Sequence, residues 1–168
     1  MKSSKEAFAT AHLVFTLIRG IHSLAEEDVI LTLKKYNIQY PSFRILWILF
    51  FEKKMTMTEL SYLALTNISN VYRQLIKLRD KNLVTIDKGK DARIKEISLT
   101  EEGRRITDEI LQLNLEFTDL NFVDLLEKIP QKELDTFIKV ASVISSELIG
   151  TNFTDWTIKT ANIIKENI

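Results

Sequence analysis

Four patterns follow one another between residues 56 and 103 with almost no residues to spare, and this stretch constrains the fold most. A short helical repeat opens it, and a second helical repeat begins at Ile68. A short β-ribbon pattern then covers 84–99, and a new helix is expected after Thr100. Only residues 65–67 separate the first two helices. Two helices joined by so short a turn and followed by a ribbon are typical of a winged helix-turn-helix.

The second helix, expected over 68–81, has two different faces. One face is mainly apolar and would contact a core; it holds Ile68, Val71, Tyr72, Leu75, Ile76, Leu78 and Arg79. The other face is polar and would point outward; it holds Ser69, Asn70, Arg73, Gln74, Lys77, Asp80 and Lys81. Arg can bind guanine, Asn or Gln can bind adenine, and Lys or Ser can bind phosphates. The polar face therefore predicts a DNA-reading helix, or alternatively an amphipathic helix whose polar side only meets water.

The residues on both sides of this helix favour DNA reading. Thr56 and Glu59 have the spacing of a capping box, which predicts the start of the preceding helix. Thr66 or Asn67 can cap the second helix and place its positive end where a phosphate can bind. Asn82 stands where the helix should end, and Asn often replaces Gly in the left-handed cap conformation.

The ribbon pattern has a basic and polar tip. Strands are expected over 84–88 and 93–99, with the turn residues of 89–92 between them. Four cations lie at or near this tip: Lys88, Lys90, Arg93 and Lys95. Such a ribbon can follow the sugar-phosphate backbone and insert an Arg into a neighbouring minor groove. Thr100 then provides the cap of a long helix.

The wing sequence carries a resemblance to a known family. Asp91-x-Arg93, followed by Leu99-Thr100-x-x-Gly103, resembles the wing signature of the MarR family of bacterial winged-helix regulators at the same spacing. The resemblance implies that Arg93 enters the minor groove and that Asp91 braces it.

Two further segments resemble the same family. The Ile-Ser-Asn-Val start of the second helix at 68–71 is similar, and so is its exit at 81–84, where Asn82 replaces the usual Gly. A weaker likeness in 5–7 and 45–48 is to the branch of the family that represses protease and sporulation genes in bacilli.

The charge of the chain is unevenly distributed although its net charge is zero. Between Ile68 and Lys95 there are eight Lys or Arg and three Asp, so this segment carries +5 and the rest of the chain −5. A basic segment confined to the expected reading head is typical of a DNA-binding module. The alternative is solvated charge that happens to be uneven. Cysteine is absent, which excludes disulfides, cysteine-ligated zinc and thiol redox sensing.

No arrangement of reactive groups typical of an enzyme is found. A Gly-rich phosphate loop, a nucleophile elbow and an HExxH motif are all absent. His12 and His22 are ten residues apart along one expected helix, so they are poor joint ligands of a metal. We therefore expect no enzyme activity, no cofactor and no metal site. The longest apolar run, 45–51, is far shorter than the ~20 residues of a membrane span, so we expect a cytoplasmic protein without a membrane partner.

Apolar stripes lie at both ends of the chain. Over 4–36 the stripe comprises Phe8, Ala11, Phe15, Ile18, His22, Ala25 and Val29. A helix with a similar stripe is expected from Gly103 to Pro130, another stripe ends at Gly150, and Thr154 can cap a last short helix. Such stripes predict that the terminal helices interleave in a homodimer, with two reading heads roughly 34 Å apart on a pseudo-palindromic site. The alternative is that the stripes pack on each other within one chain.

The expected fold is mainly α with a small β-wing. A winged helix-turn-helix core at 41–103 is flanked by dimerisation helices at 1–40 and 104–168. The expected function is that of a sequence-specific transcriptional regulator, more specifically a repressor, that binds double-stranded DNA as a homodimer. The alternative is a winged-helix module that docks an acidic protein.

Ten residues are expected to contact DNA. Those assigned to bases are Ser69, Asn70, Arg73 and Gln74. Those assigned to phosphates or to the wing contact are Asn67, Lys77, Lys88, Lys90, Asp91 and Arg93. The resemblance also allows a small-molecule effector between the dimerisation helices and the winged module, near Phe15, Arg19, Trp47 and Phe117.

Overall fold

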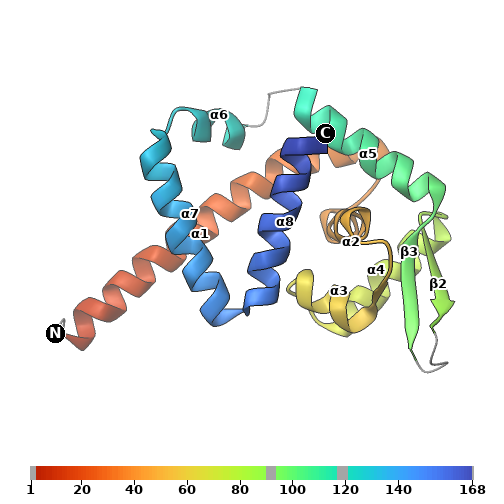
Figure 1. The fold of residues 1–168 in the computed structure, drawn as a ribbon, viewed down its shortest axis with the longest axis horizontal. Coiled ribbons are helices and arrows are strands. Elements are labelled where there is room, and N and C mark those ends of the chain that lie inside the picture. The colour runs from red at the N-terminus through yellow and green to blue at the C-terminus, as the bar shows by residue number, and fades with distance from the viewer. Residues whose placement is uncertain (1–2, 90–93, 117–120, 168) are drawn as a thin grey trace.

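The computed structural model describes residues 3–89, 94–116 and 121–167. The helix-turn-helix and its wing form one unit, drawn from orange-yellow to green in Figure 1. The N-terminal helix, in red, and the last helices, in blue, lie beside this unit (Figure 1). The expected fold class, mainly α with a small β-wing, is confirmed.

Three helices build the helix-turn-helix unit: α2 (Tyr40–Phe51), α3 (Met57–Leu63) and α4 (Ile68–Asp80). Helix α2 is almost wholly apolar and lies at the centre of the core, where Leu46 and Leu49 are fully buried. Because α3 and α4 both pack against α2, the central helix sets their relative orientation.

Local capping signals define the ends of α3 and α4. The Glu59 carboxylate accepts from the Thr56 N–H at 2.7 Å, and Thr56 Oγ1 accepts from the Glu59 N–H at 3.3 Å. The predicted capping box is therefore confirmed. Asn82 has φ of 57°, so the predicted left-handed residue after α4 is confirmed as well.

The wing is part of a three-stranded antiparallel sheet with the strand order β1-β3-β2. Strand β2 (Val84–Lys88) pairs with β3 (Lys95–Leu99) along its whole length. A very short strand β1 (Met55–Thr56), which the sequence did not predict, pairs with the other side of β3. Ile97 of β3 is fully buried, so the sheet is joined to the helical core.

The end of the wing is packed tightly against the start of α5 (Glu101–Glu116). Thr100 caps α5, because its Oγ1 accepts from the Gly103 N–H at 2.9 Å, and it also donates to the Asn82 carbonyl at 2.7 Å. A Cβ atom on Gly103 would lie only 1.9 Å from the Leu83 carbonyl oxygen. The close approach of backbone to backbone at this junction therefore requires glycine.

In the described part of the chain, four further helices lie outside the winged unit. The apolar stripe of 4–36, which is compatible with one helix or two, forms one helix, α1 (Ser4–Leu33), followed by a 3-10 turn (Lys34–Tyr36). Near the other end are α6 (Asn121–Glu127), α7 (Gln131–Leu148) and α8 (Thr151–Asn167). Helices α7 and α8 pack against each other as a hairpin (Figure 1).

Two boundaries in this region differ from the sequence-based expectation. A continuous helix to Pro130 is wrong, because α5 and α6 are separate elements, and the Phe122 N–H at the start of α6 donates to Asp28 of α1 at 3.0 Å. The last helix is not short and does not start at Thr154. That residue lies within α8, where it is buried and accepts from the Ser146 hydroxyl at 3.0 Å.

Large apolar side chains are exposed on α1 and α7. Every residue from 3 to 24 is exposed, including Phe8, Leu13, Val14, Phe15, Leu17, Ile18, Ile21 and Leu24. Helix α7 exposes Phe137, Ile138, Val140, Val143, Ile144 and Leu148. By length and composition alone, the segment Ser4–Tyr36 is long and apolar enough to cross a membrane. A search for uninterrupted apolar runs misses it, because polar residues such as Thr16 and Arg19 interrupt the segment.

Candidate nucleic-acid interface

The turn between α3 and α4 presents the N-terminus of α4 at the surface. Leu65 takes a left-handed conformation, with φ of 49°, which lets the chain reverse within three residues. Asn67 then caps α4, because its Oδ1 accepts from the Asn70 N–H at 2.8 Å. The remaining N–H groups of this first turn and the helix dipole make it a suitable place for a phosphate.

Most of the residues expected on the reading face of α4 do lie outward. Ser69, Arg73 and Lys77 are exposed, and Asn70 is half-buried at the edge of this face. The Lys77 ammonium donates to Gln39 Oε1 at 2.8 Å, which holds the cation along the start of α2. These residues form one polar strip along α4, of the size and chemistry that can follow a DNA groove.

The assignment of faces on α4 is wrong at four positions. Gln74 was expected outward, but it is only 4% exposed and bonded to Ser42 of α2. Ile68, Tyr72 and Arg79 were expected inward and are exposed. The buried stripe is narrower than a half-cylinder because α4 touches the core only along Val71, Leu75 and Leu78, together with Gln74.

Tyr72 is a surface residue that the sequence reading missed as a candidate contact. It is 48% exposed on α4, one turn after Ile68, which is exposed to the same degree. A tyrosine can contact both a thymine methyl group and a phosphate. A helical wheel that assigns only the narrow stripe around Val71, Leu75 and Leu78 to the core would have placed Tyr72 at the surface. A wheel divided into two equal halves does not.

The wing contributes fewer described candidates. Lys88 at the end of β2 is exposed, and the Gly89 N–H donates to the Ile94 carbonyl at 2.8 Å across the tip. Three expected contact residues, Lys90, Asp91 and Arg93, lie outside the described residues.

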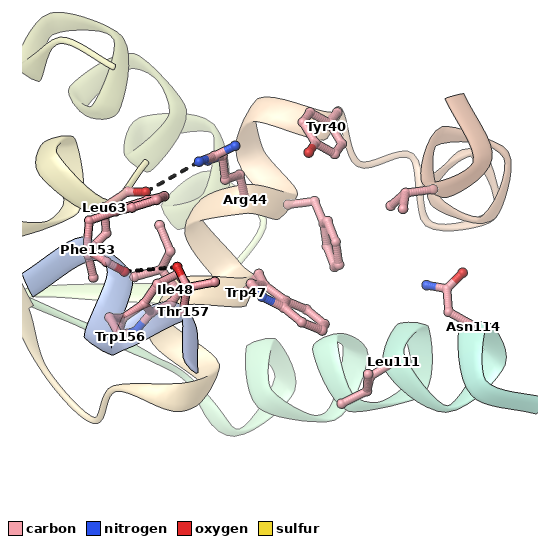
Figure 2. A pocket seen from close by; sticks show the side chains of 12 residues that line it. Tyr40, Arg44, Trp47, Ile48, Leu63, Leu111, Asn114, Phe153, Trp156 and Thr157 are labelled. Carbon is pink, nitrogen blue, oxygen red and sulfur yellow. Dashed lines mark hydrogen bonds between the residues drawn. The ribbon is translucent and has the colours of Figure 1, made fainter. Parts of the chain in front are cut away.

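A cavity of about 440 Å³ lies between the winged unit and the outer helices (Figure 2). It is lined mainly by apolar side chains of α2, α5 and α8, with Arg44 among them. Arg44 has one weak hydrogen bond, to the Leu63 carbonyl at 3.4 Å, and no carboxylate partner within the described chain. In the same part of the protein, the indole N–H of Trp156 is buried and has no hydrogen-bond partner among the described residues.

The expected effector residues are only partly brought together. Trp47 lines the cavity, but Phe15 and Arg19 lie on the exposed half of α1, and Phe117 lies outside the described residues. The sequence reading missed the contribution of α8, whose Phe153 and Trp156 form one wall (Figure 2).

The chain is similar to several known regulators. The HTH-type transcriptional repressor IacR of Pseudomonas putida is 22% identical over 125 residues, 74% of this chain and 75% of the relative. The HTH-type transcriptional regulator Hpr of Geobacillus thermodenitrificans is 25% identical over 111 residues, 66% of this chain but only 56% of the relative. No protein-family model matches the sequence.

Solved structures decide the fold. A mutant of MarR from E. coli, complexed with operator DNA, superposes with a TM-score of 0.67 at 19% identity and covers 86% of this chain and 99% of that one. The chain has the MarR winged-helix fold. A MarR family protein from Bacillus stearothermophilus, at 23% identity, gives a TM-score of 0.64 over 83% of this chain and 96% of its own. The structure of reduced AbfR bound to DNA gives a TM-score of 0.65 at 17% identity and covers 86% of this chain and 97% of that one.

Proposed function

We propose that this MarR-fold chain is a sequence-specific DNA-binding transcriptional regulator, acting as a homodimeric repressor in the cytoplasm and without catalytic activity. The main observation in support is the polar strip of α4. Its exposed residues Ser69, Arg73 and Lys77 follow the N-terminus of the helix, which Asn67 caps. The names of its relatives, repressor and transcriptional regulator, support it, as do two structural neighbours solved with DNA. A role in docking an acidic protein is not favoured.

In this proposal the residues of the interface have different roles. Ser69, Asn70 and Arg73 contact base edges, while Asn67 and Lys77 contact phosphates. Lys88 contacts the backbone from the wing. Lys90, Asp91 and Arg93 keep the roles that the family resemblance implies. Gln74 no longer belongs among the base contacts, since it is buried.

A second copy of the chain is the proposed cover for the apolar surfaces of α1 and α7. Segments 1–40 and 104–168 would then be dimerisation segments around a DNA-binding core at 41–103. The N-terminal half of α1 is exposed along its whole length, which a helix this apolar does not tolerate in water without a partner. A two-fold dimer places its two DNA-binding cores on one face of the dimer. It also gives the apolar helices at both ends of the chain a surface to pack against.

Binding to DNA is tested first by selection. Purified protein is mixed with duplexes that carry a randomised centre, and the bound fraction is sequenced. Fluorescence anisotropy then compares the enriched duplex with an unrelated duplex at two salt concentrations. We expect enrichment of a two-fold symmetric sequence, two chains per duplex and tighter binding at low salt. A pool without enrichment and without binding at low salt would contradict the proposal.

Single substitutions on α4 should separate base reading from phosphate binding. Arg73→Ala should weaken binding to the enriched duplex by about 1–3 kcal/mol and relax the preference for one base position. Lys77→Ala should weaken binding to all sequences alike and reduce the salt slope by about one unit. Anisotropy titrations on enriched and unrelated duplexes give both numbers. Equal losses on the two duplexes for Arg73→Ala would show that this residue does not read bases.

The cavity is the proposed site of an effector, an apolar organic acid. Its apolar lining fits a hydrophobic body, and the guanidinium of Arg44 fits a carboxylate. Both tryptophans of the chain, Trp47 and Trp156, line the cavity, so their fluorescence reports its occupancy directly.

Replacing Arg44 should remove the affinity for acids. We expect naphthoate to quench the tryptophan fluorescence of the native protein, and Arg44→Met to weaken this binding about 10-fold or more because it loses a charge-assisted hydrogen bond. Arg19→Met, on the exposed half of α1, is the matched control and should leave the binding unchanged. Naphthamide, which has no charge, should bind native protein and Arg44→Met alike. Unchanged naphthoate binding by Arg44→Met would exclude the carboxylate contact.

A further inference from the structure

A chain of side-chain hydrogen bonds runs from the core to the reading face of α4. The Ser42 hydroxyl on α2 donates to Gln74 Oε1 at 2.8 Å, and Gln74 Nε2 donates to Asn70 Oδ1 at 3.2 Å. The guanidinium of Arg73 donates to the same Asn70 oxygen at 2.8 Å. Asn70 Nδ2 donates to Thr66 Oγ1 at 2.9 Å. The network thus joins two buried polar residues, Ser42 and Gln74, to the two central residues of the proposed DNA contact.

The direction of every bond in this network follows from one residue. Arg73 can only donate, so the Asn70 amide must turn its oxygen toward it and its nitrogen toward Thr66. Gln74 must then present its own nitrogen to Asn70, which leaves its oxygen for Ser42. The Ser42 hydroxyl therefore has to donate. Each amide has one orientation that satisfies all partners, so the buried and the exposed ends of the network depend on each other.

Burial makes the inner end of the network stiff. Ser42 is 5% and Gln74 is 4% exposed, so water does not compete for their hydrogen bonds. A glutamine at a position where α4 meets α2 also departs from the apolar stripe of Val71, Leu75 and Leu78 that forms the rest of this contact. A purely structural contact would be served by an apolar side chain of similar size.

We propose that Ser42 and Gln74 are positioning residues that set the base preference of α4 without touching DNA. This inference rests on the proposed DNA-binding function. The pair holds the Asn70 amide in one orientation, and Asn70 holds Arg73, so both groups meet a base edge already arranged. Asn70 Oδ1 already accepts from Gln74 and Arg73 and one Nδ2–H already donates to Thr66, so the second Nδ2–H is the group that Asn70 offers to a base, and the direction of the amide decides which base acceptor can meet it. Pre-organised side chains also lose less freedom on binding.

The test compares base preference in two variants and a control. Gln74→Met keeps the length of the side chain and removes both of its hydrogen bonds, and Ser42→Ala removes only the inner donor. Thr107→Val is the matched control. It removes a buried hydrogen bond of 2.7 Å to the Gly103 carbonyl, at a fully buried residue of α5 that is not part of the network. The native protein and the three variants each go through selection from the randomised duplex pool. The unfolding temperature of each protein and its affinity for an unrelated duplex are also measured.

We expect Gln74→Met to reduce the preference for the native enriched sequence over its single-base changes about 10-fold at the positions facing Asn70 and Arg73. Its affinity for unrelated DNA and its salt slope should stay unchanged, because phosphate contacts are intact. Ser42→Ala should change the same positions to a smaller extent. Thr107→Val should lose thermal stability but keep the native base profile.

Three outcomes would overturn the inference. The first is a native base profile in Gln74→Met or Ser42→Ala. The second is a base preference that Thr107→Val relaxes as much as Gln74→Met does, because the change would then follow from lost stability and not from the network. The third is a loss on unrelated DNA as large as on the enriched sequence. A native protein that enriches no sequence would instead refute the proposed function, so the two failures are distinguishable.

Discussion

Gly103→Ala is expected to destabilise the protein by at least about 3 kcal/mol. The added Cβ would lie 1.9 Å from the Leu83 carbonyl oxygen and 2.9 Å from its carbon, and both atoms are backbone. The Leu83 oxygen also accepts from the Thr100 N–H at 3.1 Å, so moving it away would break that bond. The wing and the first turn of α5 would have to separate. Urea unfolding followed by circular dichroism, at equal chain concentrations, measures the loss.

Gly20→Ala is the control for this substitution. A Cβ on Gly20 meets no atom within 4 Å, and the residue lies inside α1. Alanine there should raise stability slightly, by about 0.5–1 kcal/mol, because it restricts the unfolded chain and favours the helix. If Gly103→Ala unfolds at the same urea concentration as the native protein, the close packing of wing and α5 is incorrect.

Leu17→Glu is expected to convert the protein to a monomer and to weaken operator binding about 100-fold or more. Leu17 is 57% exposed in the single chain, on the apolar side of α1 that we propose a second copy covers. A carboxylate buried there without a partner opposes association. Each monomer would then hold one half-site without the gain of two linked contacts. Light scattering and anisotropy on the enriched duplex measure the two effects.

Thr16→Glu is the matched control, since it adds the same charge one residue earlier. Thr16 belongs to the polar side of α1, with His12, Arg19 and Ser23 at three- and four-residue steps. It should leave the dimer and its DNA affinity nearly unchanged. A native protein that is monomeric and sediments with phospholipid vesicles would contradict the dimer and assign the apolar α1 to a membrane.

Features set by neighbouring residues were predicted from the sequence. The capping box of Thr56 and Glu59, a cap at Thr66 or Asn67, which the structure places at Asn67, and the left-handed Asn82 each depend on residues three or four positions away, which a pattern search can see. The order of helices and strands in the winged unit followed from these signals and from the apolar spacing. The MarR fold was predicted from the resemblance of the wing sequence, Asp91-x-Arg93 and Leu99-Thr100-x-x-Gly103, to that family.

Features set by distant residues were not predicted. Strand β1 exists because Met55 meets Ile97 of β3, and α6 begins where an N–H group reaches Asp28. The inward position of Gln74 depends on Ser42, a residue of another helix, and a helical wheel contains no such partner. The cavity wall formed by α8 likewise requires knowledge of where that helix packs. The reading face was therefore predicted in outline, while its inner support was not.

Helix α8 ties the reading head to the outer helices. Lys159 of α8 donates to Glu52 at 2.7 Å, and Phe153 and Trp156 pack on the core. Just before α8, the Ile149 carbonyl accepts from Tyr62 of α3 at 3.4 Å. In a dimer these ties would fix the distance between the two heads. Each base pair inserted between two half-sites turns one of them about 34° around the DNA axis. A head that packs on α8 can follow that turn only by giving up these contacts, so we expect a single inserted base pair to weaken binding to the operator.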